Sequence, residues 1–316
     1  MHINDRQLRY FVKVAEVGNM TKAAALLHVA QPALGIQVRQ LEELLGTPLF
    51  ERHSRGVSVT PAGQQLYEHA CVILRLMEEA ESEIKALGEN SQETLTLGVT
   101  PSIMRLVGSE LITAVRRDLP QVYLSLIEET SHVLQDSLQR GEIDLALTYE
   151  LPPDAPITKT PMLVEELLLV THPRNAPKNP IVSFTDLLSM ELVLAHSRDP
   201  IRILVEKAAR ERDLGVTVAY EVQSLQATQG VVMEGSAASI LPYGTVAQEL
   251  ASGKLASRRI IDPTLYRTLY LARPAGHRPF SNEDGIMRLM RSVVKQLAID
   301  LDDLATTCDS GEPVTV

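Results

Sequence analysis

The sequence predicts an α/β protein in three parts: an N-terminal helix-turn-helix with a small β-wing, one long helix, and a C-terminal two-lobed domain. Three observations predict this architecture. Three short helical patterns with a tight connection precede residue 46. An apolar repeat of helical spacing follows Thr60 and Pro61. Strand and helix patterns then alternate from residue 95 to residue 299, as in α/β domains.

Length and composition set the outer limits. A chain of 316 residues is long for one domain, and its 45% apolar content allows sizeable cores. The apolar runs are too short for a bilayer, and the N-terminus has no apolar signal-peptide segment. Cys71 and Cys308 lie far apart without metal-ligand spacing. We therefore expect a cytoplasmic protein with reduced thiols and without a metal, cofactor or membrane partner.

Charge is unevenly distributed along the chain. The net charge is −10, yet residues 1–60 hold seven Lys and Arg against five acidic residues. That segment therefore carries +2 and the remainder carries −12. A mildly basic head on an acidic body is compatible with a DNA-reading unit attached to another domain.

The first three helices form the helix-turn-helix candidate. Residues 5–17 place apolar side chains on one face, residues 21–28 start at Thr21 as the N-cap, and residues 32–45 start at Pro32 and end before Gly46. Only about three residues join the last two helices, which is typical of a helix-turn-helix. Residues 48–60 then form a β-wing, with Arg52 and Arg55 beside a turn at Gly56.

The long helix begins with Thr60 as N-cap and Pro61 in its first turn, and should run to about residue 88. Its apolar positions alternate in gaps of four and three, which is the 3.5-residue repeat of a helix that packs on another helix. About 28 residues span ~40 Å. We interpret this stripe as a dimerisation seam; the alternative is packing against the chain's own C-terminal domain. The seam consists of Leu66, Ala70, Ile73, Met77, Ala80, Ile84 and Leu87.

The C-terminal part, residues 93–301, alternates strands and helices. The expected strands are residues 95–99, 122–127, 144–148, 166–171, 192–195, 217–221, 238–241 and 268–272. The expected helices are residues 103–117, 133–140, 184–189, 200–212, 225–234, 243–252 and 282–299. This alternation predicts parallel sheets with helices on both faces. A Pro-rich stretch at residues 152–161 marks the lobe boundary, giving lobe I at about 93–160 and 265–301 and lobe II at about 161–264. Residues 302–316 are polar and are expected to form a loose tail.

Fixed-spacing motifs in residues 4–63 carry a family resemblance. They include F-x-x-V-A-E-x-G from Phe11 to Gly18, Q-P-A-L from Gln31, P-L-F-E-R from Pro48 and T-P-A-G from Thr60. Looser matches follow at Leu97-Gly98-Val99, at residues 141–146 and at residues 235–242. Together these motifs resemble the LysR-type transcriptional regulators, and among them the branch of nitrogen-assimilation and aromatic-catabolism regulators.

The resemblance implies a winged helix-turn-helix, a linker helix, and an effector domain shaped like a periplasmic solute-binding protein. It also implies a homodimer that assembles into a homotetramer, double-stranded promoter DNA as partner, regulation of a nearby operon, and contact with RNA polymerase. Three positions depart from the family pattern. Ala30 and Gly35 stand where the family commonly has Ser, and Ile36 stands where it has a polar or basic residue. Because of these departures, the sequence does not show which residues read the bases. The expected mode of DNA binding is unchanged.

The second helix of such a unit enters the major groove, with its first residues at the base edges. Gln37 suits adenine, Arg39 suits guanine or a phosphate, and Ile36 suits a thymine methyl group. The wing and the preceding helix suit phosphates or an adjacent minor groove. A two-fold dimer requires an interrupted inverted repeat. The predicted DNA-binding residues are Thr21, Lys22, Gln31, Pro32, Ala33, Gly35, Ile36, Gln37, Arg39, Arg52, His53 and Arg55.

Ligands of open α/β sheets bind beyond the carboxyl ends of strands, at helix N-termini. Hydroxyl and charged residues occupy such places in the C-terminal domain, and Arg202 among them suits a small anion such as a carboxylate. The other possibility for the hydroxyls is helix capping alone. The predicted effector-binding residues are Thr100, Pro101, Ser102, Thr130, Ser131, His132, Thr148, His196, Ser197, Arg202, Gln226 and Gly230.

The alternatives to such a regulator are a binding protein and an enzyme. A cytoplasmic small-molecule-binding protein without a regulatory role would explain residues 93–301 but leave residues 1–88 without a purpose. An enzyme is disfavoured because the sequence has no G-x-S-x-G, P-loop, H-E-x-x-H or G-x-G-x-x-G pattern in a suitable context. The expected function is therefore a sequence-specific DNA-binding transcriptional regulator controlled by a small molecule bound between two lobes.

Overall fold

A computed structural model describes residues 2–53, 56–86, 93–149, 157–176, 179–276 and 279–308. The chain divides into two compact units. The first comprises Met1–Gln92 and Gln139–Glu142, and the second comprises Glu93–Leu138 and Ile143–Val316. Among the helices in the described residues, none combines the length and apolarity that a bilayer crossing requires.

The head begins with the predicted three helices, α1 (Asp5–Val17), α2 (Met20–Leu26) and α3 (Gln31–Leu45). Their facing side chains, including Phe11 and Leu34, are fully buried in one core. The tight connection between α2 and α3 confirms the helix-turn-helix.

The N-cap of α2 differs from the prediction. Asn19, and not Thr21, caps this helix, because its Oδ1 accepts the backbone N–H groups of Thr21 and Lys22, each at 3.0 Å. Asparagine is among the strongest N-cap residues. Ala30, in contrast, caps α3 without any side-chain hydrogen bond, as its methyl side chain predicts.

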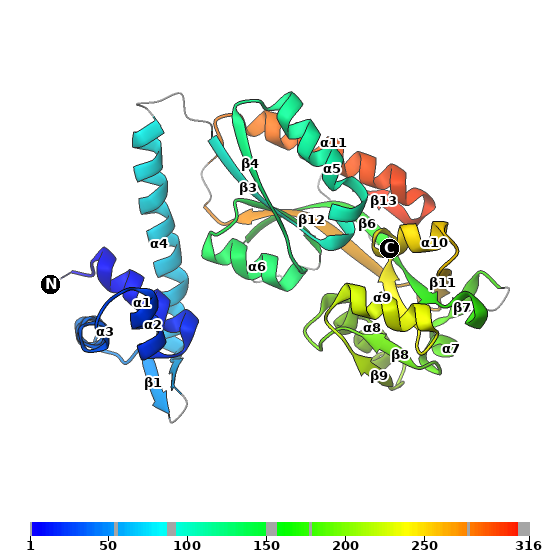
Figure 1. Ribbon diagram of the computed structural model, residues 1–316, viewed down its shortest axis with the longest axis horizontal. Helices are drawn as coiled ribbons and strands as arrows, with labels where there is room; N and C mark the ends of the chain where they lie inside the picture. The colour runs from blue at the N-terminus through cyan, green and yellow to red at the C-terminus, as the bar shows by residue number, and fades with distance from the viewer. Residues whose placement is uncertain are drawn as a thin grey trace. The chain divides into compact units, whose positions relative to one another are not determined.

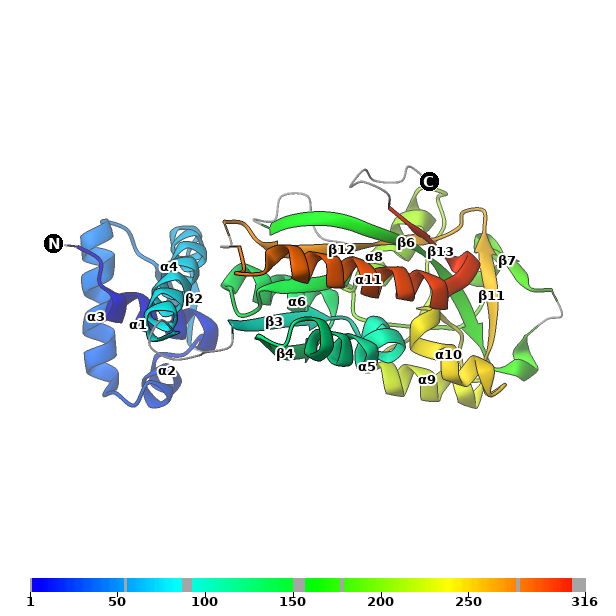
Figure 2. The same cartoon turned by 90° about the horizontal axis from the view of Figure 1, so that it is seen from above.

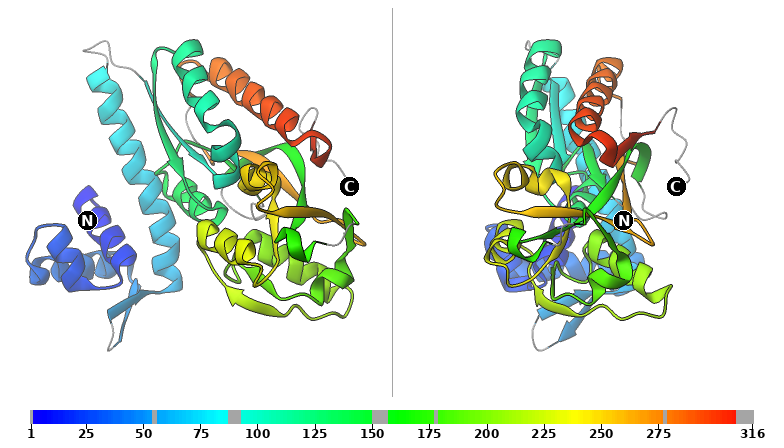
Figure 3. Two further views of the ribbon diagram at one scale, coloured as in Figure 1. Left: turned by 45° about the vertical axis from the view of Figure 1, so that its right-hand side comes forward. Right: turned by 90° about the vertical axis from the view of Figure 1, so that its right-hand side faces the viewer.

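The wing is an antiparallel hairpin of β1 (Phe50–His53) and β2 (Gly56–Val59). It lies beside the N-terminal end of the long helix (Figure 3). The backbone comes close to α1 here, since the Val57 N–H donates to the Gly18 carbonyl at 2.9 Å. A Cβ at Gly56 would stand 2.3 Å from that oxygen, so this position requires glycine.

The long helix, α4 (Pro61–Ala86), begins where predicted. Thr60 Oγ1 accepts the Gly63 N–H at 3.0 Å and so acts as the N-cap. The predicted seam is divided in two: Leu66 and Ala70 pack into the head core, whereas Ile73, Met77, Ala80 and Ile84 are exposed. The head buries the first turns because the three short helices alone cannot enclose their apolar faces. Leu87 lies outside the described residues.

The second unit is organised by a nine-stranded mixed sheet in the order β4-β3-β5-β12-β6-β11-β7, with β10 and β13 also paired to β6. Strands β3, β4 and β5 are parallel, but β12 is antiparallel to both β5 and β6. The predicted all-parallel sheets are therefore wrong. The chain leaves lobe I along β6 and returns along β12, so these neighbours run in opposite directions (Figure 1). The strands are β3 (Glu93–Val99), β4 (Val122–Glu128), β5 (Leu145–Tyr149), β6 (Ile157–Thr171), β7 (Ile181–Ser183), β10 (Ser239–Pro242), β11 (Ala256–Ile261), β12 (Tyr266–Pro274) and β13 (Ala305–Thr307).

Lobe I has helices on both faces of its sheet. Helices α5 (Pro101–Asp118) and α11 (Glu283–Leu301) lie side by side on one face, and α6 (Ser131–Arg140) covers the other (Figure 1). Leu97 and Leu147 bury their side chains under α5 and α11, and Ala146 packs under α6. The two faces follow from the alternation of side chains along β5.

Lobe II contains the two-stranded sheet β8 (Leu192–Leu194) and β9 (Val218–Glu221), the second half of β6, and four helices. The helices are α7 (Phe184–Leu188), α8 (Pro200–Arg210), α9 (Leu225–Glu234) and α10 (Tyr243–Ala251). Figure 2 shows β6 running from one lobe to the other. The expected boundary in residues 152–161 is thus partly strand, because residues 157–161 belong to β6; residues 152–156 lie outside the described residues.

The expectation of a loose tail from residue 302 does not hold for its first residues. Asp302–Leu304 forms a 3₁₀ turn, and Ala305–Thr307 is β13, antiparallel to β6. The β-branched Thr306 and Thr307 suit an edge strand, although the segment is polar overall.

Candidate functional site

A cavity of about 140 Å³ lies between the two lobes of the second unit. Lobe I contributes the loops after β3 and β4, with Thr100–Ser102, Thr130 and Ser131, and lobe II contributes the first turn of α8, α9 and β10. Tyr149 of β5 and Arg267 of β12 complete the lining. The cavity therefore lies at the carboxyl ends of the parallel strands, where open α/β sheets bind ligands.

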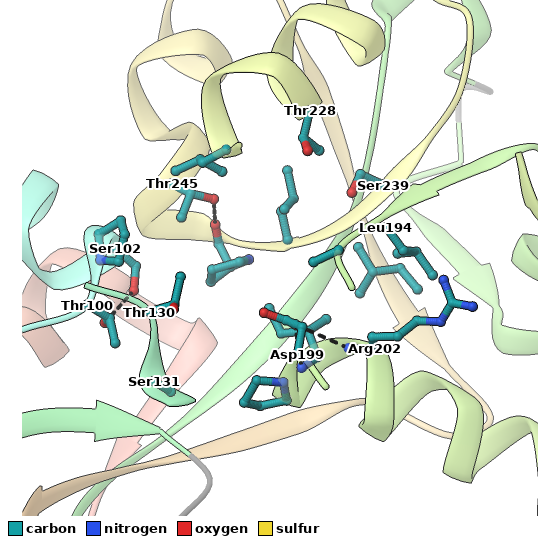
Figure 4. Close-up of a pocket in the computed structure, with 18 of the residues that line it drawn as sticks. Thr100, Ser102, Thr130, Ser131, Leu194, Asp199, Arg202, Thr228, Ser239 and Thr245 are labelled. Carbon is teal, nitrogen blue, oxygen red and sulfur yellow. Dashed lines mark hydrogen bonds between the residues drawn. The ribbon is translucent and has the colours of Figure 1, made fainter. Parts of the chain in front are cut away.

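Hydroxyl groups form the lobe I wall of the cavity (Figure 4). Thr100 is the N-cap residue of α5, but its side chain does not cap the helix; its Oγ1 instead lies 3.3 Å from Ser102 Oγ. Ser131 Oγ accepts the Tyr149 N–H at 3.3 Å, and Thr130 Oγ1 lies 3.2 Å from a ring nitrogen of His132. For Thr100, helix capping therefore does not account for the hydroxyl.

A buried charge cluster stands behind this wall. Arg267 donates from Nε at 2.9 Å and from Nη2 at 2.7 Å to Glu165 Oε2, and Nη2 also donates to Ser102 Oγ at 3.0 Å. Tyr149 donates its phenol hydrogen to the same Glu165 oxygen at 2.8 Å, and its ring lies 3.5 Å from Arg267 Cζ. Glu165 Oε1 has no hydrogen-bond partner among the described residues.

The electrostatics of the cluster keep Arg267 charged. Burial opposes a positive charge, but the carboxylate of Glu165 outweighs this, and the pKa of Arg267 is raised. Burial also raises the pKa of Tyr149, so its phenol stays protonated and remains a hydrogen-bond donor. A charged guanidinium held rigidly beside a cavity is suited to bind an oxygen anion.

The lobe II wall is mostly apolar, and two of its polar side chains make hydrogen bonds within α8, although Arg202 Nη1 is buried without a partner among the described residues. Asp199 Oδ1 caps α8 by accepting the Ile201 N–H at 2.9 Å. The Arg202 guanidinium donates to Glu206, and Figure 4 shows its side chain extending away from Thr100, Ser102 and Thr130. The apolar lining comes from Leu194, Ile201, Leu204, Val222, Leu225, Ile240 and Leu241.

The structure brings half of the predicted effector residues to this cavity. Those that line it are Thr100, Pro101, Ser102, Thr130, Ser131 and Arg202. The others are not part of its lining: His132, Thr148, His196, Ser197, Gln226 and Gly230. Thr148 is fully buried, since alternate residues of β5 point to opposite faces. The His196 ring accepts the Arg198 N–H, and Ser197 and Gln226 are exposed.

Sequence reasoning missed the Tyr149, Glu165 and Arg267 cluster. Glu165 and Arg267 are separated by 102 positions and become opposite partners only through the register of β6 and β12. The sequence places a charged residue inside each of these two apolar strand patterns. Because buried charges are usually paired, this pattern could have indicated that Glu165 and Arg267 are partners.

The head presents an exposed surface along α3. Gln31, Pro32, Ala33, Ile36 and Arg39 are exposed, and Gly35 and Gln37 are half-buried. The remaining predicted DNA contacts are placed as follows: Thr21, Lys22 and His53 are exposed, the Arg52 side chain lies outside what is described, and Arg55 lies outside the described residues.

The inward positions of α3 are closed to any ligand. Leu34, Val38 and Leu41 are at most 2% exposed, as the helical spacing predicts. Gln37 Nε2 donates to Gln40 Oε1 at 3.1 Å, which orients its amide along the exposed face.

Two family models match the chain. Residues 6–64 match the helix-turn-helix of the lysR family of bacterial regulatory proteins, and residues 88–293 match the LysR substrate-binding domain. The chain belongs to the LysR family. This LysR-family protein is a DNA-binding transcriptional regulator with a small-molecule-binding domain, and its family consists of regulators rather than enzymes.

Curated relatives extend over nearly the whole LysR-family chain. The nitrogen assimilation regulatory protein nac of Klebsiella aerogenes is 31% identical over 96% of this chain and 99% of its own length. The HTH-type transcriptional regulator BenM of Acinetobacter baylyi is 30% identical over 84% of this chain and 88% of its own.

Solved structures share the LysR-family fold. The crystal structure of full-length BenM aligns with a TM-score of 0.55 at 27% identity, covering 94% of this chain and 97% of that one. Full-length OxyR C199D from Pseudomonas aeruginosa aligns with a TM-score of 0.64 at 24% identity, covering 99% of this chain and 100% of that one. The head and the α/β domain predicted from the sequence are thus confirmed.

Proposed function

We propose that this LysR-family regulator binds an interrupted inverted repeat in promoter DNA through paired heads, and that a small anion in the cavity between the lobes changes this binding. The observation that carries the proposal is the cavity itself, lined on one side by hydroxyl donors and a buried arginine. Hydroxyl and N–H donors at a cavity wall favour a ligand that is rich in acceptors.

The DNA side of the proposal rests on the exposed face of α3. Ile36 is 56% exposed, which is unusual for an isoleucine and suits contact with a thymine methyl group. Arg39 is exposed on the same helix and supplies a charge for a guanine or a phosphate. Because one head carries a charge of only about +2, affinity must come from several heads acting together.

The assembly side rests on the exposed half of the α4 stripe. Ile73 and Ile84 are 43% and 70% exposed, and Met77 lies between them on the same face. A second copy of α4 would cover this stripe and hold two heads at a fixed spacing. The family resemblance adds a homotetramer, contact with RNA polymerase and a place in the cytoplasm, where the DNA is.

A gel-shift titration tests this function. Purified protein should shift DNA taken from upstream of its own reading frame, and the double variant Arg52→Ala/Arg55→Ala should bind it much more weakly. A Lys13→Ala variant is the control, because Lys13 pairs with Glu16 on α1. Equal binding by all three proteins would contradict the proposed DNA contacts.

A further inference from the structure

The hydrogen bonds around Ser102 determine which hydroxyl hydrogens of the cavity wall a ligand can use. Ser102 Oγ accepts a hydrogen from Arg267 Nη2 and lies 3.3 Å from Thr100 Oγ1. If the Ser102 hydroxyl hydrogen is donated to Thr100, the Thr100 hydrogen is left over, and the reverse holds equally. The Thr100 hydrogen is therefore available to a ligand when Ser102 donates to Thr100, whereas in the reverse arrangement the Ser102 hydrogen also has the Tyr149 oxygen as a possible acceptor.

Arg267 has N–H groups that its bonds to Glu165 and Ser102 do not use. A guanidinium carries five N–H hydrogens, and the bonds to Glu165 and Ser102 use those on Nε and Nη2. Within the described residues, Nη1 donates to no atom, and Arg267 is one of the residues that line the cavity. Arg267 Nη1 and the Thr100–Ser102 hydroxyls together offer several hydrogens to one acceptor group.

The charges around the cavity limit the ligand to one such group. Glu165 already balances Arg267, and the Asp199 carboxylate also lines the cavity. Arg202, the other cationic residue of the described lining, donates from Nε to Glu206; its Nη1 is buried without a partner among the described residues, but its side chain extends away from the hydroxyls. A second anionic group would have to lie against the apolar wall of lobe II, near Leu204 and Ile240. Desolvation of an unpaired charge there is unfavourable.

Size sets the remaining limit. The cavity measures about 140 Å³, and an apolar protein cavity of ~150 Å³ is known to hold one benzene molecule. The ligand therefore has on the order of six to ten non-hydrogen atoms. Its apolar part faces lobe II and its acceptor group faces lobe I.

We infer that the effector is a small monocarboxylate with an apolar body, and that Arg267 and Ser102 bind its carboxylate while Glu165 and Tyr149 hold Arg267 in position. This inference rests on the proposed effector function and assigns the charge-reading role to Arg267, not to Arg202. The three groups around Arg267 restrict its guanidinium to one orientation, which gives selectivity for the planar carboxylate over a neutral amide.

The test is binding of benzoate and hexanoate to the full-length protein, each compared with its amide, by calorimetry and thermal shift. The acids should bind with a Kd below about 10 mM, and the Kd of each amide should be at least about tenfold higher than that of its acid. Ser102→Ala removes the hydroxyl that accepts from Arg267 Nη2 but keeps Glu165 as the partner of Arg267, and it should weaken benzoate binding by about tenfold or more. Arg198→Gln, at an exposed residue outside the cavity lining, is the matched control and should leave benzoate binding unchanged.

Three outcomes would overturn the inference. If the amides bind as tightly as the acids, binding does not depend on the negative charge of the ligand, although the cavity would still be an effector pocket. Loss of benzoate binding in Arg202→Gln but not in Ser102→Ala would move the anion site to lobe II. Absence of binding by all four probes would exclude this ligand class, and DNA shifts measured in parallel would show whether the regulatory function itself is intact.

Discussion

Arg267 of β12 lies directly opposite Glu165 of β6 in the antiparallel register, and its Nη2 donates to Glu165 Oε2 at 2.7 Å. The side chains are only 8% and 1% exposed. β6 and β12 are the strands that pass between the lobes. This ion pair therefore lies where the lobes are connected, and its Arg267 also lines the cavity.

Removing one member of this pair should be much worse than removing both. Glu165→Leu leaves a buried charge on Arg267 and should lower the free energy of unfolding by about 3–5 kcal/mol. Glu165→Leu combined with Arg267→Met should recover most of that loss, because two apolar side chains then replace the pair. Urea unfolding of Glu165→Leu, Arg267→Met and the double variant measures the coupling energy of the pair. If the losses of the two single variants simply add in the double variant, this prediction is contradicted.

The recognition helix should gain stability from a capping residue. The Ala30 backbone is extended, with φ −69° and ψ 133°, and its side chain makes no cap. Ala30→Ser should therefore stabilise the head by ~1 kcal/mol, whereas Ala30→Val, which supplies no side-chain acceptor, should give no such gain. Thermal unfolding gives the comparison, and an equal effect of Ser and Val would argue against capping.

The exposed stripe of α4 should control the oligomeric state. Ile73→Asp places a charge in the predicted helix–helix contact, so the dimer should dissociate. Gln64→Asp, on the opposite side of the same helix, should leave the dimer intact. Sedimentation velocity distinguishes the two outcomes. A wild-type monomer at high concentration, or a dimer unaffected by Ile73→Asp, would refute a role for this stripe.

Gly244 should set how closely α10 approaches α5. A Cβ at this position would lie 2.8 Å from the Ser102 carbonyl oxygen, so Gly244→Ala must displace the wall of the cavity. We expect a destabilisation of about 1–3 kcal/mol together with weaker benzoate binding. Gly230→Ala is the control, since a Cβ there meets open space within a helix and should stabilise slightly.

Local patterns predicted most of the fold. The caps at Thr60 and the spacing of Leu34, Val38 and Leu41 depend on residues a few positions apart, and these predictions hold. Errors arose where several distant segments decide the outcome. Nothing in the chain near residue 166 shows that β6 would continue from lobe I into lobe II, or that it would pair with four other strands.

The same difference between local patterns and distant contacts applies to the candidate site. The loops at Thr100–Ser102 and Thr130–Ser131 could be predicted, because hydroxyl residues directly follow strands and precede helices. Arg267 could not, since its position beside Ser102 depends on a contact across 165 residues. Arg202 was predicted from its place in a helix start, but whether its guanidinium turns toward or away from the cavity depends on Glu206, its partner one turn later.

The most direct test of the account is a footprint of the full-length protein on DNA from upstream of its reading frame, repeated with Ile73→Asp. We predict protection of two inverted half-sites whose centres are a multiple of about 10.5 base pairs apart. Affinity should fall by about a thousandfold between roughly 50 and 200 mM salt, and the Ile73→Asp variant should lose the paired pattern. A single unsymmetrical protected segment, bound equally well by the variant, would contradict the central claim that paired α4 helices hold two reading heads.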